Sequence, residues 1–363
     1  MDKKMTLSIV MPIYQIAKRF NFLKQALESL AKQTYEQLEI IIVDDGSKDN
    51  TVDLVDSFIK CNDWKYKNST KLISVPINAG VSIARNLGIS HASGELIAFL
   101  DWDDLLFPQY AEKVVDTFIS NPSVYVVLPS GLFYVNYYGH EKAGLLDVPQ
   151  NINSMCFEDF KVYLLENNFP APMGSGICGR AELFSDQKIK FDAYLSKKTA
   201  EDILLGYQLL ENGIRPYFIL DEPIVLVRAY LNIASRGRGA VLQNFEFDAF
   251  KYIYSRCTHS LIIHVREKSE STYIRIKNKH DLTYATFEIK KLLLESGMRQ
   301  AFSKSWRSVA LLKKFMYYVL FLRVDPYLMG ALYPLYVYYK TQNQTKSLAT
   351  AKNYLVELEG MGE

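Results

Sequence analysis

The sequence has few cysteines, and they are spaced too widely to form a metal-binding or redox motif. None of the four, in a chain of 363 residues, belongs to a CxxC pair, which argues against a zinc site and against a disulfide scaffold. We therefore expect a reducing, cytoplasmic location and buried, unreactive thiols. The cysteines are Cys61, Cys156, Cys178 and Cys257.

Long apolar runs, a charge imbalance and a dinucleotide fingerprint are also missing. No segment reaches the roughly 18 uncharged apolar residues that a membrane-spanning helix needs. The net charge is only +2, which gives no case for nucleic-acid binding. The first strand–helix turn has no GxGxxG sequence, which disfavours a nicotinamide-dependent dehydrogenase. What the chain does have is apolar side chains, 49% of its residues, enough for a sizeable core.

Short apolar runs alternate with amphipathic segments through the first third of the chain. Such alternation predicts an α/β fold with a mostly parallel central sheet flanked by helices, and ligands bind such sheets at the carboxyl ends of the strands. The predicted strands are Leu7–Ile13, Leu38–Val43, Lys71–Val75, Leu96–Leu100 and Val124–Leu128. The predicted helices are Phe22–Gln33, Thr51–Lys60, Val81–His91 and Pro108–Ser120, with a later one from Ala200 to Asn212.

Two acidic clusters directly follow predicted strands. Asp44 and Asp45 follow the second strand, and Asp101, Asp103 and Asp104 follow the fourth. Because alternate side chains of an extended backbone point the same way, Asp101 and Asp103 can face one site. Their oxygens suit Mg²⁺ or Mn²⁺, which normally leaves room for phosphate oxygens as well. The alternative is that these aspartates are ordinary turn and helix-cap residues.

Four motifs occur in an order typical of one enzyme family. They resemble the inverting family 2 glycosyltransferases, nucleotide-diphosphosugar transferases of the GT-A fold, over residues 6–235. The resemblance implies a GT-A type sheet followed by a mainly helical C-terminal region. The motifs are Val10–Tyr14, Ile42–Ser47, the run from Asn78 through Glu95 to Asp104, and Glu201-Asp202 with Phe191-Asp192 before it.

The resemblance also implies roles for residues of the donor site. Pro12 and Tyr14 would line the base pocket, and Asp45 would accept a hydrogen bond from a uracil ring. Arg85 and Asn86 would lie near the diphosphate and the nucleoside. The alternative for Arg85 is a place on a solvated helix face.

The third and fourth motifs would supply the metal site and the general base. Asp103, with Asp101, would bind Mn²⁺ or Mg²⁺, and Asp101 would also contact the ribose or the sugar. Trp102 between them would belong to the donor site, and Asp104 would support the cluster. Asp202 would be the general base, although acids are favoured at a helix start by the dipole alone.

A further set of residues is a candidate for diphosphate or acceptor contacts. Arg228 and Ser235 match an Arg and a Ser that the family often has after the base helix, whereas Tyr230 stands in place of its His. Arg236 and Arg238 are equally well explained as exposed charge. The set consists of Glu201, Ser235, Arg236 and Arg238.

The implied function is metal-dependent transfer of a hexose from a UDP-sugar, with inversion, to a hydroxyl of a lipid- or protein-linked glycan. The context would be bacterial surface polysaccharide or glycoprotein biosynthesis. One alternative is a nucleotidyltransferase that makes a sugar nucleotide, although Pro12 stands where such enzymes have a Gly-rich loop. Another is a non-catalytic subunit that binds a nucleotide or a glycan.

The chain is expected to have three parts. Residues 1–129 would form the nucleotide-sugar-binding half, 130–239 the acceptor-binding half of the same domain, and 240–363 a helical C-terminal domain. Within the last part, residues 315–339 place aromatics between basic residues. That pattern suits peripheral contact with the inner face of the cell membrane, or else a helical bundle or a homo-oligomer interface.

Overall fold

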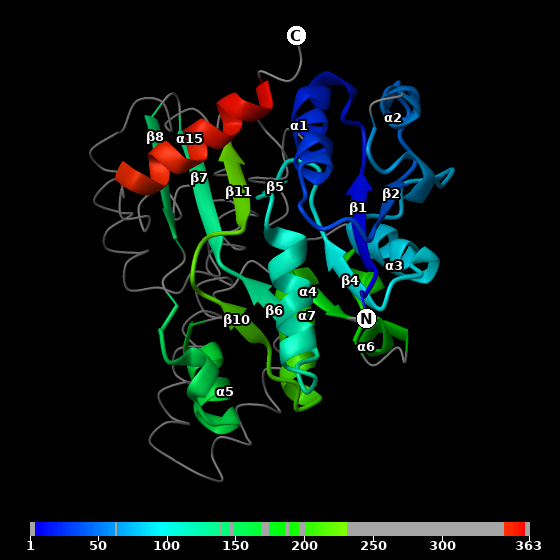
Figure 1. Cartoon of the computed structure of the whole chain (residues 1–363). Coiled ribbons are helices and arrows are strands. Elements are labelled where there is room, and N and C mark those ends of the chain that lie inside the picture. Colours follow the sequence, from blue (N-terminus) through cyan, green and yellow to red (C-terminus); the bar gives the residue numbers. More distant parts are fainter. Residues whose placement is uncertain are drawn as a thin grey trace, which may run out of the picture.

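The computed structural model describes residues 4–61, 64–137, 140–145, 148–167, 174–185, 189–196, 201–230 and 345–359. Its strands form two sheets (Figure 1). The larger sheet has seven strands in the order β10-β6-β9-β4-β1-β2-β3, all parallel except β9, which runs antiparallel to β4 and β6. They are β1 (Leu7–Ile13), β2 (Leu38–Asp44), β3 (Thr70–Ser74), β4 (Leu96–Phe99), β6 (Val126–Pro129), β9 (Cys178–Arg180) and β10 (Tyr217–Ile219).

Helices connect these strands as the alternating pattern predicted. The longer ones are α1 (Phe20–Ala31), α2 (Thr51–Lys60), α3 (Val81–His91), α4 (Tyr110–Ser120), α5 (Phe157–Asn167), α6 (Ala181–Ser185), α7 (Glu201–Glu211) and α15 (Thr345–Glu359). Single 3₁₀ turns cover Ala17–Arg19, Lys67–Ser69, Ile152–Ser154 and Ala193–Leu195. The expected α/β fold with a mostly parallel, helix-flanked sheet is therefore confirmed, and three of the predicted elements have the predicted bounds.

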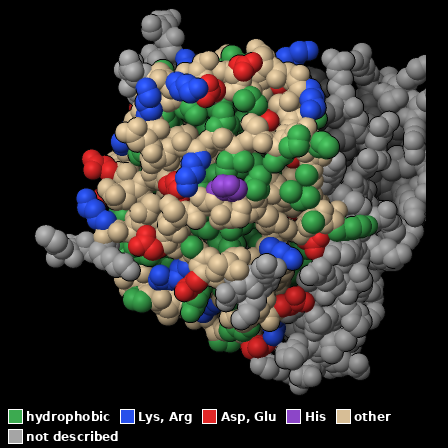
Figure 2. Space-filling view, turned by 90° about the vertical axis from the view of Figure 1, so that its right-hand side faces the viewer, with side chains coloured by type: hydrophobic (Ala, Val, Ile, Leu, Met, Phe, Trp, Pro, Cys, Tyr) green, Lys and Arg blue, Asp and Glu red, His purple; other side chains and the backbone are tan. Residues whose placement is uncertain are grey.

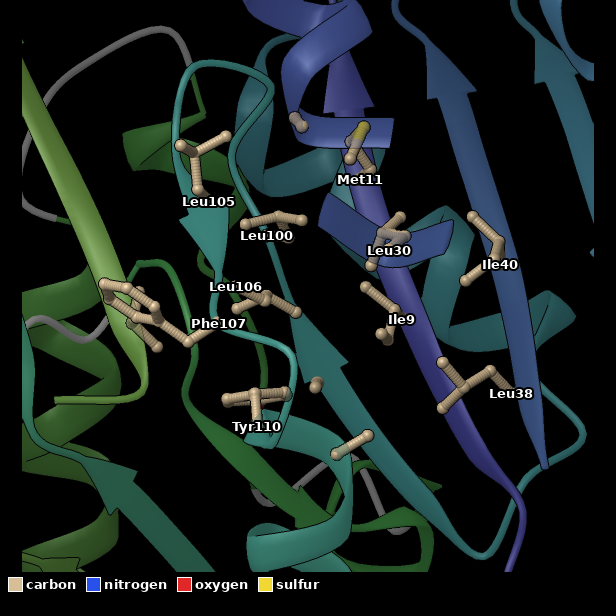
Figure 3. Close-up of a cluster of buried hydrophobic side chains, with 14 of the residues drawn as sticks. Ile9, Met11, Leu30, Leu38, Ile40, Leu100, Leu105, Leu106, Phe107 and Tyr110 are labelled. Carbon is tan, nitrogen blue, oxygen red and sulfur yellow. The ribbon is translucent and has the colours of Figure 1, made fainter. Parts of the chain in front are cut away.

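The central strands bury both faces, which explains why their sequences are continuously apolar. Because side chains alternate along a strand, Ile9 and Met11 of β1 pack into one core cluster while Val10 packs into the other. Figure 3 shows the first cluster, with Leu30 of α1 and Leu100 meeting the β1 side chains. These two apolar layers hold the strand ends in fixed positions.

A second sheet of four strands lies beside the first and was not expected from the sequence. Its order is β5-β11-β7-β8, with β11 parallel to β7 and antiparallel to β5. In Figure 1, α15 (red) lies across β8 and β7 of this sheet. The strands are β5 (Leu105–Leu106), β7 (Gly131–Tyr137), β8 (His140–Leu145) and β11 (Val225–Tyr230).

Several expectations concern the surface and the C-terminal part. Cys178 is buried as expected, but Cys61 and Cys156 are exposed, so the expectation of uniformly buried thiols was wrong. Cys257 and residues 315–339 lie outside the described residues. No described helix is long and apolar enough to cross a membrane. On the face that Figure 2 shows, acidic and basic side chains are interspersed among small hydrophobic patches.

Candidate active site

The carboxyl ends of β1, β2 and β4 meet at one edge of the larger sheet. The backbone N–H of Asp45 donates to the carbonyl of Ile13, 2.9 Å away, and that of Leu100 donates to Val10 at 3.0 Å. Because β1 lies between β2 and β4, the two acidic clusters flank the end of β1. Pro12 lies within β1, whereas Tyr14, just beyond its end, is 41% exposed at this edge.

Asp45 organises the loop that leads into α3. Its carboxylate accepts hydrogen bonds from the backbone N–H groups of Ala79 and Gly80, both at 2.7 Å, and from Nδ2 of Asn78 at 2.8 Å. The neighbouring Gly46 has φ +75° and lies so close to the Ile77–Asn78 backbone that a Cβ there would be 2.7 Å from it. The uracil contact of Asp45 stays a prediction, and the structure gives this side chain a role in loop geometry.

Arg85 links the second acidic cluster to the start of α7. Its Nη2 donates to Oδ1 of Asp101 at 2.7 Å, and its Nη1 donates to Oε1 of Glu201 at 2.9 Å. The guanidinium also lies over the ring of Phe191, 4.9 Å from the centroid, and the residue is only 2% exposed. Burial alone would lower the pKa of Arg85, but the two carboxylates raise it above its ordinary value, so the group is always charged.

The alternative reading of Arg85, a place on a solvated helix face, is therefore wrong, and its expected contact near the diphosphate stays a prediction. The structure shows instead a buried bridge between three segments: α3, the loop after β4 and the first turn of α7. Asp202 is next to Glu201 in that turn and is partly exposed, with its Oδ1 accepting from the N–H of Ile203 at 2.8 Å. The bridge thus fixes the helix that carries Asp202 relative to Asp101.

Asn86 makes a second connection between α3 and the segment before α7. Its Nδ2 donates to the carbonyl of Phe191 at 2.7 Å, and its Oδ1 accepts from the N–H of Phe191 at 3.2 Å. This pairing holds the Phe191 ring beneath Arg85. The expected nucleoside contact of Asn86 stays a prediction, because its amide is engaged with the protein backbone here.

The segment Asp101–Asp104 is held by two residues distant in sequence. Oγ of Ser175 donates to Oδ2 of Asp104 at 2.5 Å and accepts from the N–H of Asp101 at 3.0 Å. Arg228 of β11 donates its N–H to Oδ1 of Asp104 at 2.8 Å and its Nε to the carbonyl of Asp103. Burial and the nearby charges of Asp103 and Asp101 raise the pKa of Asp104 well above its usual value.

The chemistry of this segment fits a divalent cation bound partly by phosphate. The side chain of Asp101 is 32% exposed, and a Cβ at Gly174 would come within 3.2 Å of its Oδ2, so the glycine keeps that oxygen uncovered. The described residues contain no group of three or more His, Cys, Asp or Glu side chains placed to hold a metal. The metal role of Asp101 and Asp103 stays a prediction: two carboxylates, with phosphate oxygens and water as the other ligands, would match the way proteins bind Mg²⁺.

Of the remaining candidate site residues, Trp102 is among the residues that the structure describes, and the others are not. Trp102 packs edge-on against Phe22 of α1, with 6.4 Å between ring centroids, and contributes to the core. The sequence pattern gave no individual role to Ser175, Phe191 or Gly174, although Phe191 belongs to the fourth motif and the Ser-Gly-rich loop that begins at Gly174 was expected to approach the donor or the acceptor. Ser235, Arg236 and Arg238 lie outside the described residues.

Comparison with known proteins gives consistent matches over the region just described. Residues 8–186 match the family model described as Glycosyl transferase family 2. A Bacillus subtilis protein provisionally assigned as the glycosyltransferase EpsE is 31% identical over 222 residues, 61% of this chain and 72% of that protein. The glycosyltransferase GlyG of Streptococcus pneumoniae is 37% identical over 123 residues, 32% of this chain. The match covers 38% of GlyG and less than half of several other relatives.

Solved structures show the same fold at low sequence identity. TarS 1-349 of S. aureus in complex with UDP-GlcNAc superposes with a TM-score of 0.54 and 20% identity, over 85% of this chain and 78% of that one. The mannosyltransferase PcManGT of Pyrobaculum calidifontis, in complex with GDP-Man and Mn²⁺, has a TM-score of 0.50 and 16% identity, over 91% and 86% of the two chains. Because the sequence identities are this low, these two similarities show a shared fold and nothing more.

Proposed function

Because the chain belongs to glycosyl transferase family 2, and is thus a glycosyltransferase, we propose that it transfers a hexose from a UDP-sugar to a hydroxyl of a glycan. The transfer inverts the anomeric centre and depends on Mn²⁺ or Mg²⁺. The acceptor is lipid- or protein-linked, within bacterial surface polysaccharide or glycoprotein biosynthesis. Family membership favours this function over a nucleotidyltransferase.

Relatives support the donor and the pathway class. TarS is recorded with UDP-GlcNAc, and PcManGT with GDP-Man and Mn²⁺. One curated relative is the minor teichoic acid biosynthesis protein GgaA of Bacillus subtilis, 35% identical over 143 residues. Tyr14, exposed at the sheet edge described above, offers an aromatic ring on which a base can stack.

The bridge from Asp101 through Arg85 to Glu201 is the observation that carries the proposal. It joins the segment suited to the donor diphosphate to α7, the helix that carries Asp202 in its first turn. When bound, a divalent cation supplies positive charge that stabilises the departing nucleotide diphosphate. Asp202 accepts the proton of the acceptor hydroxyl as its oxygen attacks the anomeric carbon, and a single displacement of this kind inverts that centre.

Replacement of the proposed base tests the catalytic assignment. In the variant Asp202→Asn we expect turnover with the best donor from a panel of nucleotide sugars to fall about 100-fold or more, because the amide cannot accept that proton. UDP affinity, measured by calorimetry, should stay near the wild-type value. Unchanged turnover would remove the base assignment.

The same assay examines the metal and the donor. EDTA and Asp103→Asn should each abolish transfer, and added Mn²⁺ should restore it only to the EDTA-treated wild type. Asp56→Asn, a change in an exposed ion pair with Lys60 on α2, is the control for removal of a surface carboxylate. Transfer that persists in EDTA would count against the metal, and release of an intact sugar nucleotide as product would count against transferase activity.

A further inference from the structure

Helix α15 returns to the region of the acidic clusters from far along the chain. Ala351, Tyr354 and Leu358 are buried in the same core cluster as Leu105 and Leu106 of β5. In the middle of the helix Lys352 pairs with Glu141 of β8, and near its C-terminal end Glu357 pairs with Lys32, just beyond α1. The helix is thus attached to β8 and to the end of α1.

Tyr354 makes the direct contact between α15 and β5. Its hydroxyl donates to the carbonyl oxygen of Leu106 at 2.6 Å, and its ring stacks on Phe107 with 4.6 Å between centroids and 22° between planes. The residue is 5% exposed. Burial raises the pKa of Tyr354, so the hydroxyl keeps its proton and acts as the donor.

The contacted strand follows directly on the acidic segment. Leu105 comes immediately after Asp104, and β5 pairs with Leu226 and Val225 of β11, the strand that also carries Arg228. In addition, Ser29 of α1 accepts a hydrogen bond from the N–H of Leu106 at 3.2 Å. Leu106 is therefore the fixed end of a short chain segment whose other end is Asp101.

We propose that Tyr354 is a positioning residue, which fixes β5 and thereby the conformation of Asp101–Asp104 in which Asp103 meets the divalent cation. This inference rests on the proposed function. If the hydroxyl is removed, the nearest remaining side-chain donor to the Leu106 carbonyl is Nε2 of Gln33 at 3.5 Å, which is too long for a strong hydrogen bond. The strand then loses its hydrogen bond to α15 and keeps only the apolar contacts with that helix.

The variant Tyr354→Phe tests this role in the full-length protein, because it keeps the stacked ring and removes only the hydroxyl. We expect faster amide hydrogen exchange in residues 101–107 and Mn²⁺-dependent UDP binding weakened about threefold to tenfold, as the loss of one hydrogen bond predicts. Exchange is followed by mass spectrometry and binding by calorimetry. Lys352→Gln is the matched control on the same helix, because its partner Glu141 lies on β8, and both readouts should stay at the wild-type value.

Two outcomes separate this inference from the function on which it rests. Unchanged exchange in residues 101–107 and unchanged UDP affinity, together with a lower melting temperature, would show that Tyr354 only stabilises the fold and would overturn the inference. Absence of Mn²⁺-dependent UDP binding in the wild-type protein would overturn the proposed function instead. The exchange rates, which need no ligand, then still decide whether α15 fixes the acidic segment.

Discussion

A single buried arginine connects two parts of the site at the scale of residues. Arg85 satisfies Asp101 and Glu201 with its two terminal nitrogens, and Asn86 holds the aromatic ring on which its guanidinium lies. Removing one member of such a buried pair is costly, because the charge left behind has no water to stabilise it. The geometry also requires a planar fork, which lysine does not provide.

We expect Arg85→Lys to lower turnover about tenfold or more and to destabilise the fold by roughly 2 kcal/mol. The ammonium keeps the charge but cannot hold both carboxylates in place, so α7 and Asp202 shift relative to Asp101. Steady-state transfer assays and urea unfolding measure the two effects.

Arg180→Lys is a suitable control for that substitution. Arg180 also uses its guanidinium to join segments, but it donates to the carbonyls of Val124, Pro122 and Phe118. It should lose stability with little change in kcat. An equal fall in kcat for both variants would mean that Arg85 acts on the whole fold rather than on the site.

At the scale of elements, the turn after β2 depends on a glycine with no space for a side chain. Gly46 has φ +75°, and its Cβ position lies against the backbone of Ile77 and Asn78. That same backbone leads to the N–H groups that Asp45 holds. The turn and the start of α3 are therefore built as one unit.

Gly46→Ala should destabilise the protein by about 3 kcal/mol, because the strain of positive φ adds to a clash with backbone that cannot move aside freely. We also expect weaker UDP binding, since the displaced loop carries the partners of Asp45. Urea unfolding and calorimetry measure the two effects.

Gly213→Ala separates the cost of the positive φ from the cost of the backbone clash. Gly213 has φ +68°, but no atom lies within 4 Å of its Cβ position, so only the backbone strain of about 1 kcal/mol applies. UDP affinity should not change in this variant. Equal destabilisation of the two variants would show that the contact of Gly46 with Ile77 and Asn78 carries no energy.

Elements also mark the limit of what the sequence could predict. Leu7–Ile13, Thr51–Lys60 and Val81–His91 were predicted with their observed bounds, because a continuous apolar run between turn residues and an amphipathic run of ten or eleven residues are both clear signals. Strands β5 and β9 have two and three residues and carry no such signal. The antiparallel insertion of β9 and the strand β5 were consequently missed. The longer strands of the second sheet, β7, β8 and β11, lie in a part of the chain whose pattern is less regular.

The sequence predicted that acidic residues lie at the sheet edge, but not which residues form hydrogen bonds with them. The two aspartate clusters follow strands and were placed at the sheet edge from the pattern alone. The contact between Arg85 and Glu201 joins residues 116 positions apart, and Arg228 donates its N–H to Asp104 across 124. One sequence contains no signal for such pairings, which arise only once the strands are ordered.

At the scale of the whole molecule, a carboxylate at the amino edge of the sheet ties several segments together. Burial alone would raise the pKa of Glu39, but hydrogen bonds from Lys71, Ser8 and Ser93 lower it to about 2. These partners come from β3, β1 and the turn before β4. Glu39 therefore joins the strands at the end opposite the acidic clusters.

This arrangement predicts acid sensitivity. The pKa of Glu39 is lower in the folded protein than in the unfolded chain, so its stabilisation is present at neutral pH and is lost as the pH falls from 4.5 towards about 2. A shift of this size corresponds to about 3 kcal/mol. Urea unfolding at pH 7 and pH 3 should show a smaller pH-dependent loss in Glu39→Gln than in the wild type.

Asp56→Asn provides the comparison, because the Asp56–Lys60 pair is exposed and contributes little. Its stability should depend on pH as the wild-type stability does. If Glu39→Gln follows the same pH curve as the wild type, another group is responsible for the acid sensitivity.

The position of Glu39 bears on how a protein with this sheet can evolve. The hydrogen bonds of Glu39, which hold the strands together, lie at the amino ends of the strands. The loops that contain Asp45 and Asp101 extend from the carboxyl ends. Substitutions in those loops can alter which molecules are accepted while the opposite rim continues to enforce strand order. Changes in which molecules are accepted and the stability of the strand order thus depend on opposite ends of the same sheet.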